Sequence, residues 1–150
     1  MIYGADDLLG AVRERIERSA LLRSRVRLVG AAAHADLAAF YSAADLFVLG
    51  SHHEGSGYAM IEAMACGAVP VVTDIPTFRL LTGGASVGGL WTPGDATRLA
   101  HALGDVARRD LAAERGGVLD HFARHFSWPA IGRRALEIYD ELFFLRSSFG

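Results

Sequence analysis

Two glutamates, Glu54 and Glu62, carry the clearest chemical signal in this sequence. Glu54 is followed by Gly55 and Gly57, and Glu62 lies in an apolar stretch that ends at Gly67. Glycine lets the backbone approach a ligand closely and adopt torsions that other residues avoid. The free amides at the start of the helix expected here favour an anion such as phosphate, and a carboxylate one turn inside it can accept two hydrogen bonds from neighbouring ribose hydroxyls. The segment therefore predicts a site for a phosphorylated, hydroxyl-rich ligand.

A plainer interpretation treats Glu54 as a solvated loop acid and Glu62 as a surface acid paired with an arginine. Against it, Glu62 lies between the apolar triplets 59–61 and 63–65, and an ionised carboxylate in apolar surroundings needs a partner. The pattern of glycines around the two acids is also far more specific than a pair of acids alone. We therefore favour the ligand-binding interpretation.

The segments around the two glutamates alternate between apolar strands and amphipathic helices. Residues 46–49 are apolar throughout, as in a strand covered on both faces. Such alternation predicts an α/β fold in which helices flank a parallel sheet. Ligands of these sheets bind at the carboxyl ends of the strands, and the first glutamate follows strand 46–49. The expected strands are 2–4, 26–29, 46–49, 69–73 and 87–91, and the expected helices begin near residues 6, 36, 58, 76, 96, 111 and 128.

The composition describes a globular core without a marked surface charge. The chain has 150 residues, of which 51% are hydrophobic and 21% are charged, and this length suffices for one domain. The formal net charge is −2 and the basic residues form no block, which argues against nucleic acid as a partner. All 15 basic residues are arginine, so any mechanism that uses a lysine must take it from outside this sequence.

The cysteine content and the hydropathy favour a cytoplasmic protein. Cys66 is the single cysteine, so no internal disulfide can form, and we expect a buried thiol in a reducing compartment. No apolar run in the sequence approaches the roughly 20 residues of a membrane-spanning helix. The first residues also lack the basic region of a signal peptide.

The segment that contains both glutamates resembles the signature of a known enzyme family. It reads Ser51-x2-Glu54-Gly55-x-Gly57-x4-Glu62-Ala63-Met64-Ala65-x-Gly67-x2-Pro70-Val71-Val72. This is similar to the signature of retaining nucleotide-sugar glycosyltransferases with the two-domain B-type fold, the glycosyl transferases group 1. Further matches extend the resemblance over nearly the whole chain: Arg25-Val26-x3-Gly30, Tyr41-x2-Ala44-Asp45-Leu46-Phe47-Val48, Gly89-x2-Thr92-Pro93-Gly94-Asp95 and Phe126-Ser127-Trp128.

The resemblance implies that residues 1–150 are the Rossmann-like, C-terminal domain that binds the donor, one half of the B-type fold. We expect this domain to lack its first strand and the N-terminal acceptor domain. The whole enzyme would move a hexose from a UDP- or GDP-linked donor to an acceptor with retention, in polysaccharide or glycolipid biosynthesis. Family members need no metal, we expect no cofactor, and the full-length protein is expected to associate peripherally with a membrane.

The resemblance also implies a role for each residue of the signature. Glu54 stands beside the donor sugar as the catalytic carboxylate, and Glu62 binds the ribose hydroxyls. The remaining roles belong to the backbone: Gly55, Ser56, Gly57, Tyr58 and Ala59 contact the sugar and the diphosphate, and Gly30, Ala31 and Ala32 lie along the nucleotide base.

Two departures from the family pattern bear on activity. Ser56 stands where the family usually has phenylalanine, which changes the packing of the loop. The family grips the diphosphate with an arginine and a lysine after the first strand of this domain, and this sequence contains no lysine. We therefore expect the chain on its own to bind nucleotide weakly and to transfer no sugar.

Two other functions remain open. One is a non-catalytic module that binds a nucleotide or a sugar. The other is a hydrolase, because Gly84-Ala85-Ser86-Val87-Gly88 fits the Gly-x-Ser-x-Gly pattern of a nucleophile elbow. That elbow needs a strand before the serine and a helix after it, whereas a Thr-Gly-Gly turn precedes Ser86, so a glycine-rich loop is the better interpretation.

The histidines and the final helix allow further expectations. His121 and His125 have the spacing of metal ligands on a helix, but no third ligand is suggested, so we predict no metal site. His52 and His53 are equally compatible with contact to phosphate and with a solvated role. The apolar residues of 138–145 are expected mostly in the core, and any left exposed would favour self-association of the chain.

Overall fold

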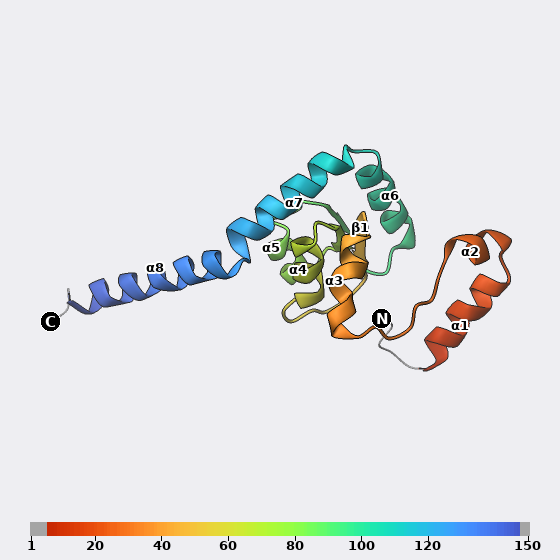
Figure 1. The fold of residues 1–150 in the computed structure, drawn as a ribbon, viewed down its shortest axis with the longest axis horizontal. Helices are drawn as coiled ribbons and strands as arrows, with labels where there is room; N and C mark the ends of the chain where they lie inside the picture. Colours follow the sequence, from red (N-terminus) through yellow and green to blue (C-terminus); the bar gives the residue numbers. More distant parts are fainter. Residues whose placement is uncertain (1–5, 148–150) are drawn as a thin grey trace. The chain divides into compact units, whose positions relative to one another are not determined.

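The structure, a computed structural model, describes residues 6–147 (Figure 1). It divides into two compact units, residues 1–37 and 38–150. Along the described residues the elements are α1 (Asp6–Glu17), α2 (Ala20–Arg25), α3 (His34–Ser42), β1 (Leu46–Leu49), α4 (Tyr58–Ala65), β2 (Val69–Thr73), α5 (Pro76–Leu81), β3 (Gly89–Trp91), α6 (Ala96–Ala107), α7 (Leu111–His125) and α8 (Trp128–Ser147).

In the first unit, the strand predicted at residues 26–29 is wrong. The segment between α2 and α3 has no regular secondary structure, and Val26, Leu28 and Val29 are all exposed. A short apolar segment becomes a stable strand only when a neighbouring strand pairs with it, and none of the described strands does so. The strand end predicted at residues 2–4 lies outside the described residues.

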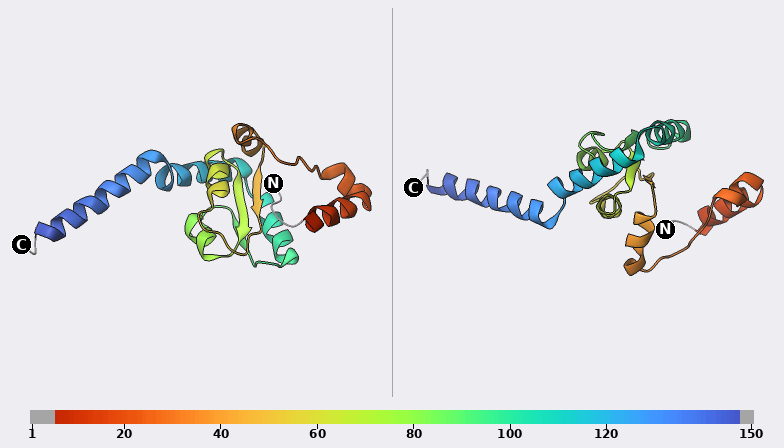
Figure 2. Two further views of the ribbon diagram at one scale, coloured as in Figure 1. Left: turned by 90° about the horizontal axis from the view of Figure 1, so that it is seen from below. Right: turned by 45° about the horizontal axis from the view of Figure 1, so that its top comes forward.

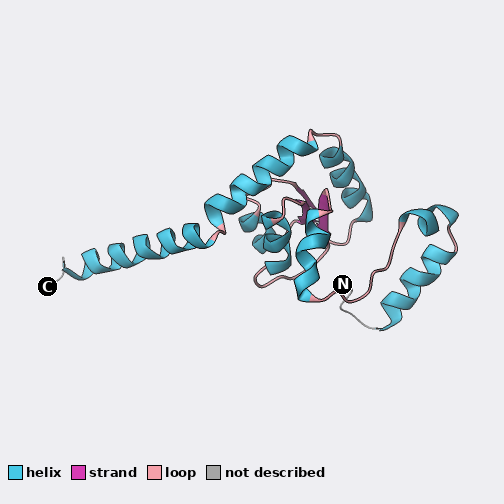
Figure 3. Ribbon diagram, in the orientation of Figure 1, coloured by secondary structure: helices cyan, strands magenta, loops and turns pink. Residues whose placement is uncertain are grey.

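The second unit is built on a parallel sheet of three strands in the order β1-β2-β3 (Figure 2). In β2 every residue is buried, and Val71 pairs with Val48 on one side and with Gly89 on the other. The helices α4, α6 and α7 pack on these strands, as Figure 3 shows with helices in cyan and strands in magenta. The predicted α/β fold, with helices flanking a parallel sheet, is therefore confirmed.

The two outer strands differ from the sequence expectation, β1 in its cover and β3 in its length. β1 lies at one edge of the described sheet, and Val48 on it is 45% exposed, so the expectation that strand 46–49 is covered on both faces is wrong. β3 is shorter than the predicted strand 87–91. It begins only after Gly88, whose φ of +72° departs from the extended backbone of a strand.

The helix α4 follows from the spacing of its apolar residues and ends where the sequence places a glycine. Met60 and Met64 are four residues apart and fully buried on one helix face. Beyond the last turn, Gly67 adopts a φ of +81° and its amide donates to the Met64 carbonyl at 2.9 Å, a common glycine-dependent helix end. Arg115 of α7 adds a hydrogen bond to the Cys66 carbonyl at 2.8 Å.

The final helix, α8, differs from the prediction that its apolar residues lie mostly in the core. Several of them are exposed: Ile138, Tyr139, Leu142, Phe143 and Phe144. An apolar stripe is buried only where another element packs along it, which the local sequence does not reveal. Self-association through these residues stays a prediction. Among the helices of residues 6–147, none has both the length and the apolar character that crossing a membrane requires.

Candidate functional site

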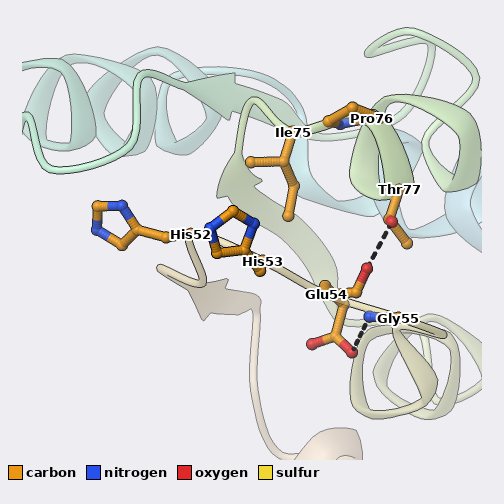
Figure 4. A pocket seen from close by; sticks show the side chains of 7 residues that line it. All are labelled: His52, His53, Glu54, Gly55, Ile75, Pro76 and Thr77. Carbon is orange, nitrogen blue, oxygen red and sulfur yellow. Dashed lines mark hydrogen bonds between the residues drawn. The ribbon is translucent and has the colours of Figure 1, made fainter.

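A cleft of about 500 Å³ lies beside the turn that carries the first glutamate (Figure 4). One wall comes from the loop after β1 and the other from the segment after β2. Because the two strands are parallel, both walls stand at the carboxyl edge of the sheet, where ligands of such folds bind. The lining residues are His52, His53, Glu54, Gly55, Ile75, Pro76 and Thr77.

Glu54 is half-buried and is held at both its side chain and its backbone. Its carboxylate Oε1 accepts hydrogen bonds from the amides of Gly55 at 3.1 Å and Gly57 at 3.3 Å. Its backbone carbonyl accepts a hydrogen bond from Thr77 Oγ1 at 2.7 Å (Figure 4). Two of the amides that the sequence assigns to a ligand are thus bonded to the protein's own carboxylate.

Gly57, the residue before α4, has a backbone conformation that glycine adopts far more readily than other residues. Its φ is +67°, and a Cβ at this position would stand 2.5 Å from Cδ1 of Leu81. No side chain caps this helix start, and the first amides of a helix have no partner within it. The backbone of Tyr58 and Ala59, both exposed, therefore offers hydrogen-bond donors and a positive dipole end to an anion.

Glu62 lies in the second turn of α4 and is half-buried. Glu62 interacts with Tyr41 of α3, whose ring meets the ring of Phe47 edge-on with centroids 5.9 Å apart. Burial, and then the charge of Glu62 and its hydrogen bond with the phenol, raise the pKa of Tyr41. The phenol therefore stays protonated and donates to the carboxylate. The sequence predicts that Glu62 needs a partner, and only the fold identifies Tyr41.

The predicted site residues fall in different units of the structure. Those from Glu54 to Glu62, with Ser56 exposed at the tip of the turn, lie in the second unit. Gly30, Ala31 and Ala32 belong to the first unit, in the segment without regular secondary structure, where Gly30 has a φ of +77°. Their role along a nucleotide base stays a prediction.

Sequence reasoning missed the second wall of the cleft, Ile75 to Thr77. These residues carry no charge and match no motif, so nothing in their types draws attention to them. A signal was present in the topology, since a segment that follows β2 must emerge beside the one that follows β1 in a parallel sheet. His52 and His53 do line the cleft with exposed side chains.

The competing sites lack the geometry that their chemistry needs. Ser86 lies in a turn before β3, with no strand leading into it, and its hydroxyl donates to the Thr82 carbonyl at 2.9 Å; the hydrolase interpretation is therefore wrong. His121 is buried and its Nε2 bonds to the Leu81 carbonyl at 2.9 Å. Across the part of the chain that the structure describes, no group of three or more His, Cys, Asp or Glu could hold a metal ion.

Comparison with known proteins identifies similar sequences. A family model described as "Glycosyl transferases group 1" matches residues 1–109. The D-inositol 3-phosphate glycosyltransferase of Thermobispora bispora is 37% identical over 120 residues, which are 77% of this chain and 27% of that protein. The GDP-mannose:cellobiosyl-diphosphopolyprenol alpha-mannosyltransferase of Xanthomonas campestris is 33% identical over 138 residues, 89% of this chain and 34% of that protein.

A solved structure supports the same relationship at the level of the fold. The sucrose-phosphate synthase of Thermosynechococcus elongatus superposes with a TM-score of 0.69 at 32% identity. The match covers 90% of this chain and 35% of that one. The chain thus spans about a third of the length of the proteins to which it is similar.

Proposed function

Because the chain belongs to the family of group 1 glycosyl transferases, we propose that it binds the donor in an enzyme that moves a hexose from a nucleotide diphosphate sugar to an acceptor with retention. The observation that carries this proposal is the turn from Glu54 to Gly57, which leads into the uncapped start of α4 beside the cleft. Catalysis would come from positioning and from stabilisation of charge on the leaving diphosphate.

Glu54 is the proposed catalytic carboxylate. Its side chain would contact the hydroxyls of the donor sugar and stabilise positive charge as the glycosidic bond breaks. The backbone amides of Ser56, Tyr58 and Ala59 would contact the sugar and the diphosphate, supported by the dipole of α4. Gly55 and Gly57, whose amides bond to the Glu54 carboxylate, would instead let the main chain approach both groups closely.

Glu62 would anchor the ribose, because a carboxylate can accept hydrogen bonds from both vicinal hydroxyls. The base would lie along Gly30, Ala31 and Ala32.

The name of the Xanthomonas campestris relative supports a sugar nucleotide as the donor, because it includes GDP-mannose. Its acceptor, as named, is a cellobiosyl-diphosphopolyprenol, which supports a lipid-linked acceptor and peripheral association of the whole protein with the cytoplasmic face of a membrane. The acceptor would bind to parts of the enzyme beyond these 150 residues, so the chain alone should not transfer sugar.

Calorimetric titration of UDP and of GDP into the wild-type chain and Glu62→Ala tests the ribose role. Since a hydrogen bond to a charged group contributes about 1.5–3 kcal/mol, the variant should bind its preferred nucleotide roughly tenfold or more weakly. Glu137→Ala is the matched control, because Glu137 is exposed on α8 and pairs with Arg134 at 3.1 Å. Equal binding by wild type and Glu62→Ala would reject the ribose role.

A second measurement separates binding from transfer. The wild-type chain is incubated with UDP-glucose or GDP-mannose and the release of nucleoside diphosphate is followed. We expect binding without turnover. Turnover by the chain alone would contradict the need for further parts of the enzyme, and absence of any nucleotide binding would reject the donor site itself.

A further inference from the structure

Thr77, the second residue of α5, joins the two walls of the cleft. Its hydroxyl Oγ1 donates to the backbone carbonyl of Glu54 at 2.7 Å, across 23 positions of the chain. Figure 4 shows this bond between the start of α5 and the turn after β1. The bond is to the main chain of the residue whose carboxylate is proposed to face the sugar.

The methyl group of the same threonine lies near the last residue of the turn, because a Cβ added to Gly57 would stand 3.9 Å from Thr77 Cγ2. The start of α5 therefore bonds to the first residue of the turn and lies close to the last one. Between these points, the Glu54 carboxylate accepts from the Gly55 and Gly57 amides, so the position of its oxygens depends on the course of the main chain.

We propose that Thr77 is a positioning residue that fixes Glu54 for contact with the donor sugar, a role that rests on the proposed donor-binding function. A carboxylate recognises hydroxyls only from a narrow range of positions. Without the Thr77 hydroxyl, the Glu54 carbonyl loses its partner on α5 and the turn is free to shift within the cleft. The ribose contacts of Glu62 depend on the second turn of α4 instead, so we expect the sugar to lose more affinity than the nucleoside diphosphate.

Two substitutions separate the hydroxyl from the methyl group. Thr77→Val has nearly the shape of threonine and lacks the donor, whereas Thr77→Ser keeps the donor and lacks the methyl. Thr82→Val is the control for lost stability, because Thr82 is fully buried and its hydroxyl donates to the Phe78 carbonyl at 2.7 Å, away from the cleft lining.

The measured quantity is the affinity for a sugar nucleotide divided by the affinity for the matching nucleoside diphosphate, with UDP-glucose against UDP and GDP-mannose against GDP. Thr77→Val should lower this ratio about three- to tenfold, the range for one hydrogen bond. Thr77→Ser should retain the wild-type ratio, and Thr82→Val should lower the melting temperature with the ratio unchanged.

Other results would overturn the role of Thr77. An unchanged ratio in folded Thr77→Val, or equal losses for both ligands, means that the threonine is merely structural. A wild-type chain that binds nucleoside diphosphate without any gain from the sugar rejects the positioning role while leaving nucleotide binding intact. A wild-type chain that binds neither ligand rejects the proposed function, and this role with it.

Discussion

Leu81 of α5 occupies the space that any side chain on Gly57 would need, with its Cδ1 only 2.5 Å from the position of a Cβ. Gly57 also has a φ of +67°, a conformation that costs other residues roughly 1–2 kcal/mol. The backbone at the start of α4 therefore requires a glycine at position 57, because the Leu81 side chain fills the space beside it.

Gly57→Ala should destabilise the chain by about 1–3 kcal/mol, from backbone strain and displacement of Leu81. Gly55→Ala is the matched control, because a Cβ there meets nothing within 4 Å, and its effect should stay within about 0.5 kcal/mol. Urea unfolding followed by circular dichroism measures both. Equal stability of the two variants would show that the contact with Leu81 relaxes freely.

The Tyr41 phenol should make stability depend on alkaline pH. Burial, then the charge of Glu62, raise its pKa in the folded protein, so the folded chain holds the phenolic proton more tightly than the unfolded chain. The resulting stabilisation is complete below about pH 10, the ordinary pKa of tyrosine, and is lost as the pH rises through the higher folded-state value.

Tyr41→Phe removes this dependence. The difference in unfolding free energy between wild type and variant should therefore shrink as the pH rises above about 10. Urea unfolding of both proteins at several pH values between 7 and 11 measures it, and the other tyrosines cancel in the difference. A constant difference across this range would contradict the raised pKa of Tyr41 in the folded protein.

Arg115 stabilises the carboxyl end of α4 from α7. Its guanidinium donates to the Cys66 carbonyl at 2.8 Å, and a Cβ on Gly67 would stand 2.9 Å from its side chain. Arg115→Ala should lower the free energy of unfolding by about 1 kcal/mol, through a lost hydrogen bond and lost packing.

Arg124→Ala is a control on the same helix, since Arg124 is exposed and bonds to the Asp120 carbonyl of its own helix. If Arg124→Ala lowered the free energy of unfolding as much as Arg115→Ala, the role of Arg115 at the end of α4 would be contradicted.

Two glycines weaken α7 without a structural need. Gly116 and Gly117 lie inside the helix, have ordinary negative φ, and a Cβ on either meets nothing within 4 Å. Glycine costs a helix interior about 1 kcal/mol relative to alanine. Gly116→Ala and Gly117→Ala should each raise the melting temperature, measured by scanning calorimetry. A lower melting temperature in either variant would show that α7 requires glycine at that position.

The sequence predicts well those helix ends that depend on residues only a few positions away. A helix is predicted to begin near residue 96, and Asp95 is of the residue type that caps helix starts; its Oδ1 accepts from the Arg98 amide at 2.9 Å. The end of α4 before β2 is likewise predicted from Gly67, which has a positive φ. Such features depend on residues within a few positions of each other, which a sequence displays directly.

The predictions from sequence are wrong where burial or pairing depends on a residue far away in the chain. The apolar segment 26–29 and the aromatic residues of α8 both look suited to burial, but burial requires another element to pack on them, and their own residue types do not say whether one does. The same limit applies to the site. The signature of two glutamates is visible in the sequence, whereas the Thr77 bond to Glu54 and the Tyr41 bond to Glu62 join residues that only the fold brings together.

Both walls of the cleft, both glutamates and Thr77 come from one unbroken stretch of the chain, residues 51–77. A single exchange of this block between relatives would carry both walls of the cleft into another scaffold, whereas Tyr41 and Leu81, which face Glu62 and Gly57, would come from that scaffold. Under the proposed function, such an exchange should change the donor preference in one step, while β3 and the helices that follow keep their own sequence. Residues 51–77 are then the unit to transplant in order to alter the sugar of the proposed donor site.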